Sequence, residues 1–209
     1  MTLEEMRRNI RFGLGLREPE ELPIIDQKIN DGIKDVLRRT GCTVQCFDAD
    51  PPDDGRLTLS TSIMRVQHIV RNSKRLDRVT YESLSRYPQA YSQVGNIIIF
   101  GTPFSTSERL QIYAVPRPND LLDPDDALEN ETFGGIPEEF QDAVELYAMS
   151  ELADLTSDET SQRGGTYKVQ YEGQDGRTGR LAEIRREINK MSGLTLGRAH
   201  LDYRLIGVR

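Results

Sequence analysis

The segment from Ile136 to Leu155 constrains the fold most, because its sequence predicts a helix that is apolar around most of its circumference. Pro137 suits a first helical turn, since its fixed φ is helical and its missing N–H would have no partner there. Apolar residues then recur at helical spacing at Phe140, Ala143, Val144, Tyr147 and Ala148. Such a helix is usually buried against several neighbours, so we predict a central helix at about residues 137–155.

Two further helices are expected before the central one. Thr2 and Glu5 have the spacing of a capping box, in which the hydroxyl accepts a backbone N–H and the carboxylate reaches back to the cap. This pattern predicts a helix at about residues 3–12. Pro23 begins a second apolar-periodic segment, which predicts a helix at about residues 23–40.

Strands are expected between about residues 56 and 115. Residues 96–100 (Asn-Ile-Ile-Ile-Phe) form an unbroken, mostly β-branched run, which is the clearest strand signal in the chain. Residues 109–115 alternate between apolar and polar side chains, and we predict that they form a hairpin with residues 96–100. Residues 42–47 fit either a strand or a turn.

The C-terminal part is expected to contain a helix followed by an arm. We predict a core domain of residues 1–155, then a flexible break and a C-terminal helix within residues 156–193, where Gly193 ends the helix. Residues 194–209 then form an extended arm. The predicted fold class is α+β and mainly helical: a helical bundle around the central helix, with a small antiparallel β-sheet and the extended C-terminal arm.

Charge is divided unevenly along the chain, whose net charge is −7. Residues 160–209 carry ten Lys and Arg against five Asp and Glu, whereas residues 1–159 carry seventeen against twenty-nine. Duplex DNA is held through its phosphates by clustered Lys and Arg, so such an acidic body should not grip it. A basic C-terminal part on an acidic body indicates a macromolecular partner.

Two segments are candidate contact sites. The loop at residues 119–131 has six acidic residues and no basic one, and long loops of this kind are often functional; the acids are Asp120, Asp123, Asp125, Asp126, Glu129 and Glu131. The C-terminal arm combines arginines with alternating apolar residues, which suits a peptide that adds a strand to a sheet edge; the residues are Arg198, Leu201, Tyr203, Arg204, Leu205 and Arg209.

Motifs of common enzyme and cofactor classes are absent from the sequence, including the phosphate-binding P-loop and the G-x-S-x-G nucleophile turn. The two cysteines, Cys42 and Cys46, are too few for a zinc site, since His68 and His200 lie far away in sequence. The acids in residues 48–55 lack the ligand positions of a calcium loop, so a solvated turn is expected. We predict no catalytic residue, metal or cofactor.

The order of these elements resembles that of a known protein family. A helix pair leads to a strand with Gly-Asn-Ile-Ile-Ile-Phe at residues 95–100, and a later strand ends Tyr-Ala-Val-Pro-Arg-Pro at residues 113–118. An acidic loop precedes a helix that begins Ile-Pro-Glu-Glu-Phe at residues 136–140 and carries Leu-Tyr-Ala-Met-Ser-Glu-Leu-Ala at residues 146–153. Over residues 3–192 the chain resembles the head-to-tail connector (adaptor, or head-completion) proteins of tailed bacteriophages.

The resemblance implies a structural virion protein at the head–tail junction, assembled in the host cytoplasm, and not an enzyme. Such proteins form a ring, typically a dodecamer, under the portal protein. The ring extends the DNA channel, and its surface docks the next neck or tail protein (a stopper, tail tube or nozzle). DNA would pass through without specific binding, and no membrane partner is expected. The acidic loop would face the lumen or a neighbouring copy, and the arm would reach the portal.

Alternatives of other kinds stay open at this point. One is a small metal-dependent hydrolase or nuclease that uses the loop carboxylates. Another is a tail completion or terminator protein. The chain has no apolar run long enough to cross a bilayer, and residues 1–12 lack the apolar region of a signal peptide, so a cytoplasmic site of synthesis is expected.

Overall fold

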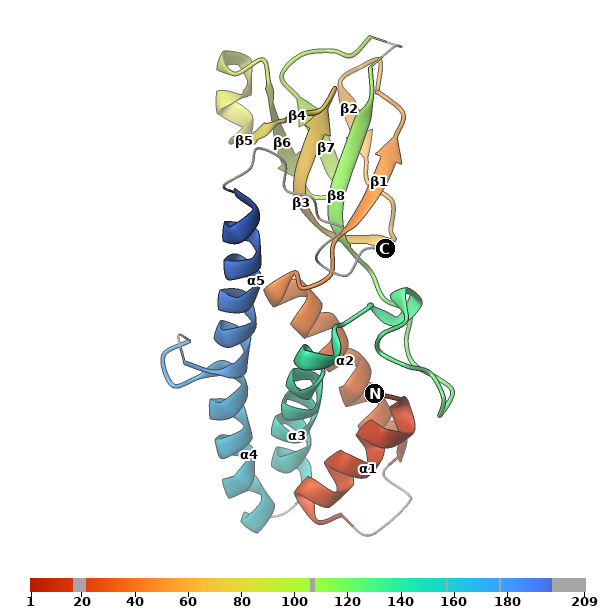
Figure 1. Cartoon of the computed structure of the whole chain (residues 1–209), viewed down its shortest axis with the longest axis vertical. Helices are drawn as coiled ribbons and strands as arrows, with labels where there is room; N and C mark the ends of the chain where they lie inside the picture. The colour runs from red at the N-terminus through yellow and green to blue at the C-terminus, as the bar shows by residue number, and fades with distance from the viewer. Residues whose placement is uncertain (17–21, 106–107, 157, 177, 197–209) are drawn as a thin grey trace. The chain divides into compact units, whose positions relative to one another are not determined.

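The chain divides into two compact units (Figure 1). The first, called the helical unit, combines Met1–Thr43 with the chain from Pro118 onward; the second, called the β unit, is Val44–Arg117. Residues 1–155, expected to form one core domain, therefore contribute to both units. The computed structural model describes residues 1–16, 22–105, 108–156, 158–176 and 178–196.

Five α-helices make up most of the described helical unit: α1 (Leu3–Leu14), α2 (Leu22–Thr40), α3 (Asp142–Thr156), α4 (Asp158–Glu172) and α5 (Arg180–Leu196). The capping box of α1 is confirmed, because Thr2 Oγ1 accepts the Glu5 N–H and a Glu5 carboxylate oxygen accepts the Thr2 N–H. Gly15 ends α1 in the left-handed conformation, at φ 69°. The helix predicted at residues 23–40 is also confirmed.

Helix α3 is the central helix of the unit, in contact with α1, α2 and α4. Four of the five residues expected to be buried are at most 1% exposed, and Tyr147 is half-buried; the four are Phe140, Ala143, Val144 and Ala148. The predicted start at Pro137 is wrong, since α3 begins at Asp142. A 3-10 turn, η4 (Glu138–Phe140), precedes it, because the N–H groups of Phe140 and Gln141 bond three residues back.

The C-terminal helices differ from the sequence expectation. Helix α4 occupies most of the segment expected as a flexible break, and α5 continues through Gly193 to Leu196. Glycine lowers helix propensity by only about 1 kcal/mol relative to alanine, so it ends a helix only when it adopts another conformation. Gly173 does so after α4, where its φ is +82° and its N–H donates to the Val169 carbonyl.

The β unit contains two four-stranded sheets instead of the one sheet expected. Their strand orders are β1-β8-β3-β4 and β2-β7-β6-β5, and all pairs are antiparallel except β5 with β6. The strands are β1 (Gln45–Ala49), β2 (Arg56–Thr58), β3 (Ile63–Arg71), β4 (Lys74–Arg75), β5 (Asp77–Arg78), β6 (Ala90–Val94), β7 (Ile97–Phe100) and β8 (Leu110–Pro116). An α+β fold is thus confirmed.

The predicted hairpin between residues 96–100 and 109–115 is wrong. Strand β7 pairs with β6 and β2, whereas β8 pairs with β1 and β3 in the other sheet. The two-residue turn at Gly95 and Asn96 explains the difference, because it brings Val94 opposite Ile97 and so joins β7 to the strand before it. Buried side chains of both sheets meet in one core, which includes Ile69, Tyr91, Ile98, Leu110 and Ile112.

Candidate functional site

The acidic loop, residues 119–131, is anchored to the helical unit by the side chain of Asn30 on α2. The Leu121 N–H donates to Asn30 Oδ1 at 2.8 Å, and Asn30 Nδ2 donates to the Leu121 carbonyl at 3.2 Å. Leu121 and Leu128 are both buried. The loop is therefore held by hydrogen bonds between its backbone and the Asn30 side chain and by apolar packing, although its sequence has no helix or strand pattern.

The loop also contacts the beginning of α1. The N–H groups of Leu3 and Glu4 donate to the carbonyls of Asp126 and Pro124, at 2.9 and 3.1 Å. The first N–H groups of a helix have no partner within it, so the loop carbonyls satisfy two of them. The position of this loop thus depends on α1 as well as on α2.

The six acidic residues of the loop differ in what they contact. Asp126 accepts the N–H groups of Leu122 and Asp123, and Asp120 forms an ion pair of 2.6 Å with Lys34. Glu129 lies 2.5 Å from the amino group of Met1. Over the described residues, no ion pair involves the three remaining, exposed acids, which are Asp123, Asp125 and Glu131.

An exposed leucine lies among the free carboxylates, and sequence reasoning missed it. Leu122 is 78% exposed and is followed by Asp123, Pro124 and Asp125, which are exposed as well. We call Leu122–Asp125 the loop tip. An apolar side chain beside free carboxylates is suited to contact another macromolecule. The other predicted site residues, those of the arm, lie outside the described part of the chain; they are Arg198, Leu201, Tyr203, Arg204, Leu205 and Arg209.

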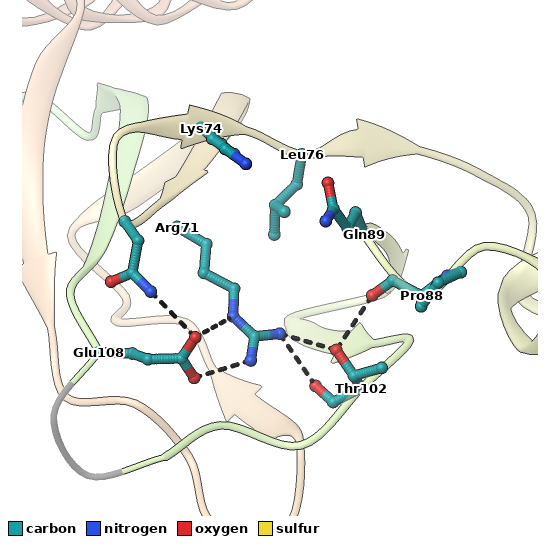
Figure 2. Close-up of a pocket in the computed structure, with 8 residues that line it drawn as sticks. Arg71, Lys74, Leu76, Pro88, Gln89, Thr102 and Glu108 are labelled. Atoms are coloured by element: carbon teal, nitrogen blue, oxygen red, sulfur yellow. Dashed lines mark hydrogen bonds and ion pairs between the residues drawn. The ribbon is translucent and has the colours of Figure 1, made fainter.

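The β unit has a pocket of about 370 Å³, and Figure 2 shows residues that line it, among them the ion pair of Arg71 and Glu108. Arg71 binds Glu108 through two parallel hydrogen bonds of 2.9 and 2.7 Å, and its guanidinium also donates to Thr102 Oγ1 at 2.8 Å. Nothing in the sequence indicates this pair, because its members lie 37 positions apart. The other lining residues are Asn72, Lys74, Leu76, Pro88 and Gln89.

The Arg71 guanidinium is satisfied by the protein itself. Besides Glu108 and Thr102, it lies over the Phe104 ring, 4.1 Å from the ring centroid. Hydrogen bonds from Arg71 lower the pKa of Glu108 to about 2, from an ordinary value of 4.5. The pair therefore joins β3 to the chain before β8, and the Arg71 guanidinium is already occupied by protein groups.

The lowered pKa of Glu108 predicts a pH-dependent stability. A depressed carboxyl pKa stabilises the fold above pH 4.5, and this contribution is lost as the pH falls from 4.5 toward 2. We expect the melting temperature of the wild type to fall more steeply in this window than that of Glu108→Gln, which cannot titrate there. Circular dichroism melts at pH 6, 4 and 3 would measure this. Parallel curves for the two proteins would contradict the ion pair.

The described residues contain no group of three or more His, Cys, Asp or Glu side chains that could hold a metal ion. His68 is buried and stacks on Tyr113, with ring centroids 4.5 Å apart. Burial, with a further contribution from Arg75, lowers the His68 pKa to about 4. In the described chain, no helix is both long enough and apolar enough to cross a bilayer.

Comparison with known families bears on the classes of function left open by the sequence. A family model described as SU10 adaptor protein matches residues 1–195. The chain belongs to the SU10 adaptor family. No curated protein matches the chain. The SU10 adaptor family is one of phage head–tail adaptors, which is a structural class and not a class of enzymes, and it implies a location in the virion.

Proposed function

We propose that the protein is the head-to-tail adaptor of a tailed phage, which forms a ring under the portal, extends the DNA channel and docks the next neck or tail protein. The match of the SU10 adaptor family to residues 1–195 carries this proposal, because it spans both units. The ring is a dodecamer built from copies of this chain. It is assembled in the host cytoplasm and lies in the neck of the virion.

Because α5 extends to Leu196, we take the C-terminal arm as residues 197–209. We propose that this arm docks on the portal protein. Its arginines favour an acidic surface, and its alternating Leu201, Tyr203 and Leu205 suit the edge of a sheet.

The acidic loop is proposed to face the channel lumen or a neighbouring copy. Three of its acids are exposed and form no ion pair with another described residue, and the net charge of the chain is negative. Like charges repel, so such a surface lets DNA pass without binding it. The exposed Leu122 favours a contact with a neighbouring copy at the loop tip, since apolar surface gains by burial.

Deletion of residues 197–209 tests the role of the arm. We expect a folded protein with an unchanged melting temperature, because the deletion removes none of the described elements. Binding to purified portal-bearing heads, measured by co-sedimentation, should fall at least roughly tenfold, as expected when a charged, apolar peptide contact is lost.

The matched control replaces residues 197–209 by a Gly-Ser segment of equal length, which keeps the chain length and removes the side chains. It should behave like the deletion. If either variant sediments with the heads at wild-type occupancy, the folded units hold the adaptor on the portal, and the proposal for the arm is wrong.

A further inference from the structure

The two outer edges of the β unit carry opposite charge. Strands β1 and β2 are edge strands of the two sheets, and β4 and β5 are the edge strands on the other side. Two inner strands separate the edges in each sheet, so the edges lie about 14 Å apart at a strand spacing of about 4.8 Å. Figure 1 shows β1 and β5 on opposite sides of the unit.

The edge formed by β1, β2 and the loop between them is acidic. Four exposed aspartates lie on it against one exposed basic residue, Arg56 on β2; the aspartates are Asp48, Asp50, Asp53 and Asp54. Asp48 accepts a hydrogen bond from Gln111, and Asp54 accepts the Arg56 N–H. Within the described residues none of the four forms an ion pair. We call this surface the acidic edge.

The edge formed by β4 and β5 is basic. Lys74, Arg75 and Arg78 are exposed and face a single acid in the same stretch, Asp77. Only Leu76 lies between the two strands, and it is buried, so the three cations project from a continuous piece of backbone. None of them forms an ion pair with another described residue. We call this surface the basic edge.

We propose that the acidic edge of one copy binds the basic edge of the next copy. This inference rests on the proposed ring, for which it names the contact surfaces. Both halves of the contact lie on the β unit, on opposite sides, so each copy can bind one neighbour through each edge. Contacts of this head-to-tail kind generate a ring when the rotation between copies closes.

The strand edges add a second argument. Edge strands present backbone N–H and C=O groups that readily pair with another chain, and natural proteins cover them or protect them with charge. Here the charge has one sign on each edge. Like edges therefore repel, which prevents two copies from pairing through the same edge, while unlike edges attract. The arrangement thus favours one polarity of assembly.

Charge reversal tests the proposal with the full chain and portal-bearing heads. The first variant carries Asp50→Lys with Asp53→Lys, and the second carries Lys74→Glu with Arg75→Glu. Counting Arg56, the first variant changes the acidic edge from a net charge of −3 to +1, and the second changes the basic edge from +2 to −2. In each variant both edges then have the same sign, so we expect at least a roughly tenfold loss of head-bound copies for either variant alone. Mixed in equal amounts, the two variants have complementary edges, and occupancy should return.

Two controls accompany the reversal. Glu138→Lys with Glu139→Lys makes the same change of charge on an exposed turn of the helical unit and should bind heads like the wild type. Raising the salt concentration should weaken assembly of the wild type and partly restore each single reversal, because salt screens attraction and repulsion alike.

A thiol cross-link identifies the touching edges. Cys46 is exposed on β1, Cys42 is buried, and Ser73 lies exposed beside Lys74. Head-bound Ser73→Cys should give a ladder of linked copies with a short bismaleimide, and the further change Cys46→Ser should remove it. A missing ladder, or one that survives Cys46→Ser, would overturn the proposed contact.

The outcomes separate this inference from the proposed function. If the wild type fails to bind portal-bearing heads, the adaptor role itself fails. If the wild type binds and either charge reversal alone reaches full occupancy, the adaptor role stands and the edge contact is wrong. The edge contact is also wrong if the mixture of the two variants stays unbound.

Discussion

Replacing Val144 by aspartate is expected to unfold the helical unit at room temperature or to lower its melting temperature by many degrees. Val144 lies on α3 with no exposed surface, and the backbone of α2 passes close by at Gly32. A carboxylate placed there would be removed from bulk water. An uncompensated buried charge costs about 3–5 kcal/mol, a large share of the roughly 5–15 kcal/mol that holds a domain folded.

The matched control for Val144→Asp is Leu122→Asp, since Leu122 is also aliphatic but lies 78% exposed on the loop tip. We expect this change to alter the free energy of unfolding by no more than about 0.5 kcal/mol. Urea titrations followed by circular dichroism would compare the two variants. Equal midpoints for both would show that the Val144 face of α3 is not buried.

Replacing Gly179 by alanine is expected to have the second largest effect, through the junction of α4 and α5. A Cβ at Gly179 would lie 2.2 Å from the Gly173 nitrogen and 2.3 Å from the Glu172 carbonyl carbon. Both are backbone atoms, so relief of the clash requires the end of α4 to move. Overpacking of this kind costs about 1–3 kcal/mol and more where the backbone is involved.

Gly165→Ala provides the comparison. Gly165 lies inside α4, and nothing lies within 4 Å of a Cβ added there. Alanine has the higher helix propensity, so this change should stabilise α4 by up to about 1 kcal/mol. Thermal melts should therefore move in opposite directions for the two glycine variants. A lower melting temperature for both would contradict the close approach at Gly179.

The sequence predicted those helices whose local signals are strong. The capping box of α1 and the periodic apolar faces of α2 and α3 are properties of consecutive residues. Helix α4 was expected only in part, at about residues 167–173, because contacts with distant residues contribute to its stability. The Tyr171 hydroxyl donates to the buried Asp35 at 2.8 Å, and the Tyr167 hydroxyl donates to the Gly13 carbonyl at 3.0 Å.

Strand pairing and the candidate site depended on contacts between distant residues. The sequence shows that β7 and β8 are strands, but their partners follow from turns and from packing in two separate sheets. Likewise, the acidic loop was found by composition, whereas its anchoring by Asn30 joins residues 91 positions apart. Charge and periodicity along the chain do not show which distant residues will contact each other, because these contacts form only when the chain folds.

The division of the chain has a consequence for the evolution of such genes. The whole β unit, Val44–Arg117, is one uninterrupted stretch inserted between two parts of the helical unit. Its first and last strands, β1 and β8, are hydrogen-bonded neighbours, with Gln45 opposite Ala114, so the chain enters and leaves the unit side by side. Two crossovers, one at each end of this stretch, could therefore exchange the entire insert between related phages and leave every helix from α1 to α5 encoded unchanged.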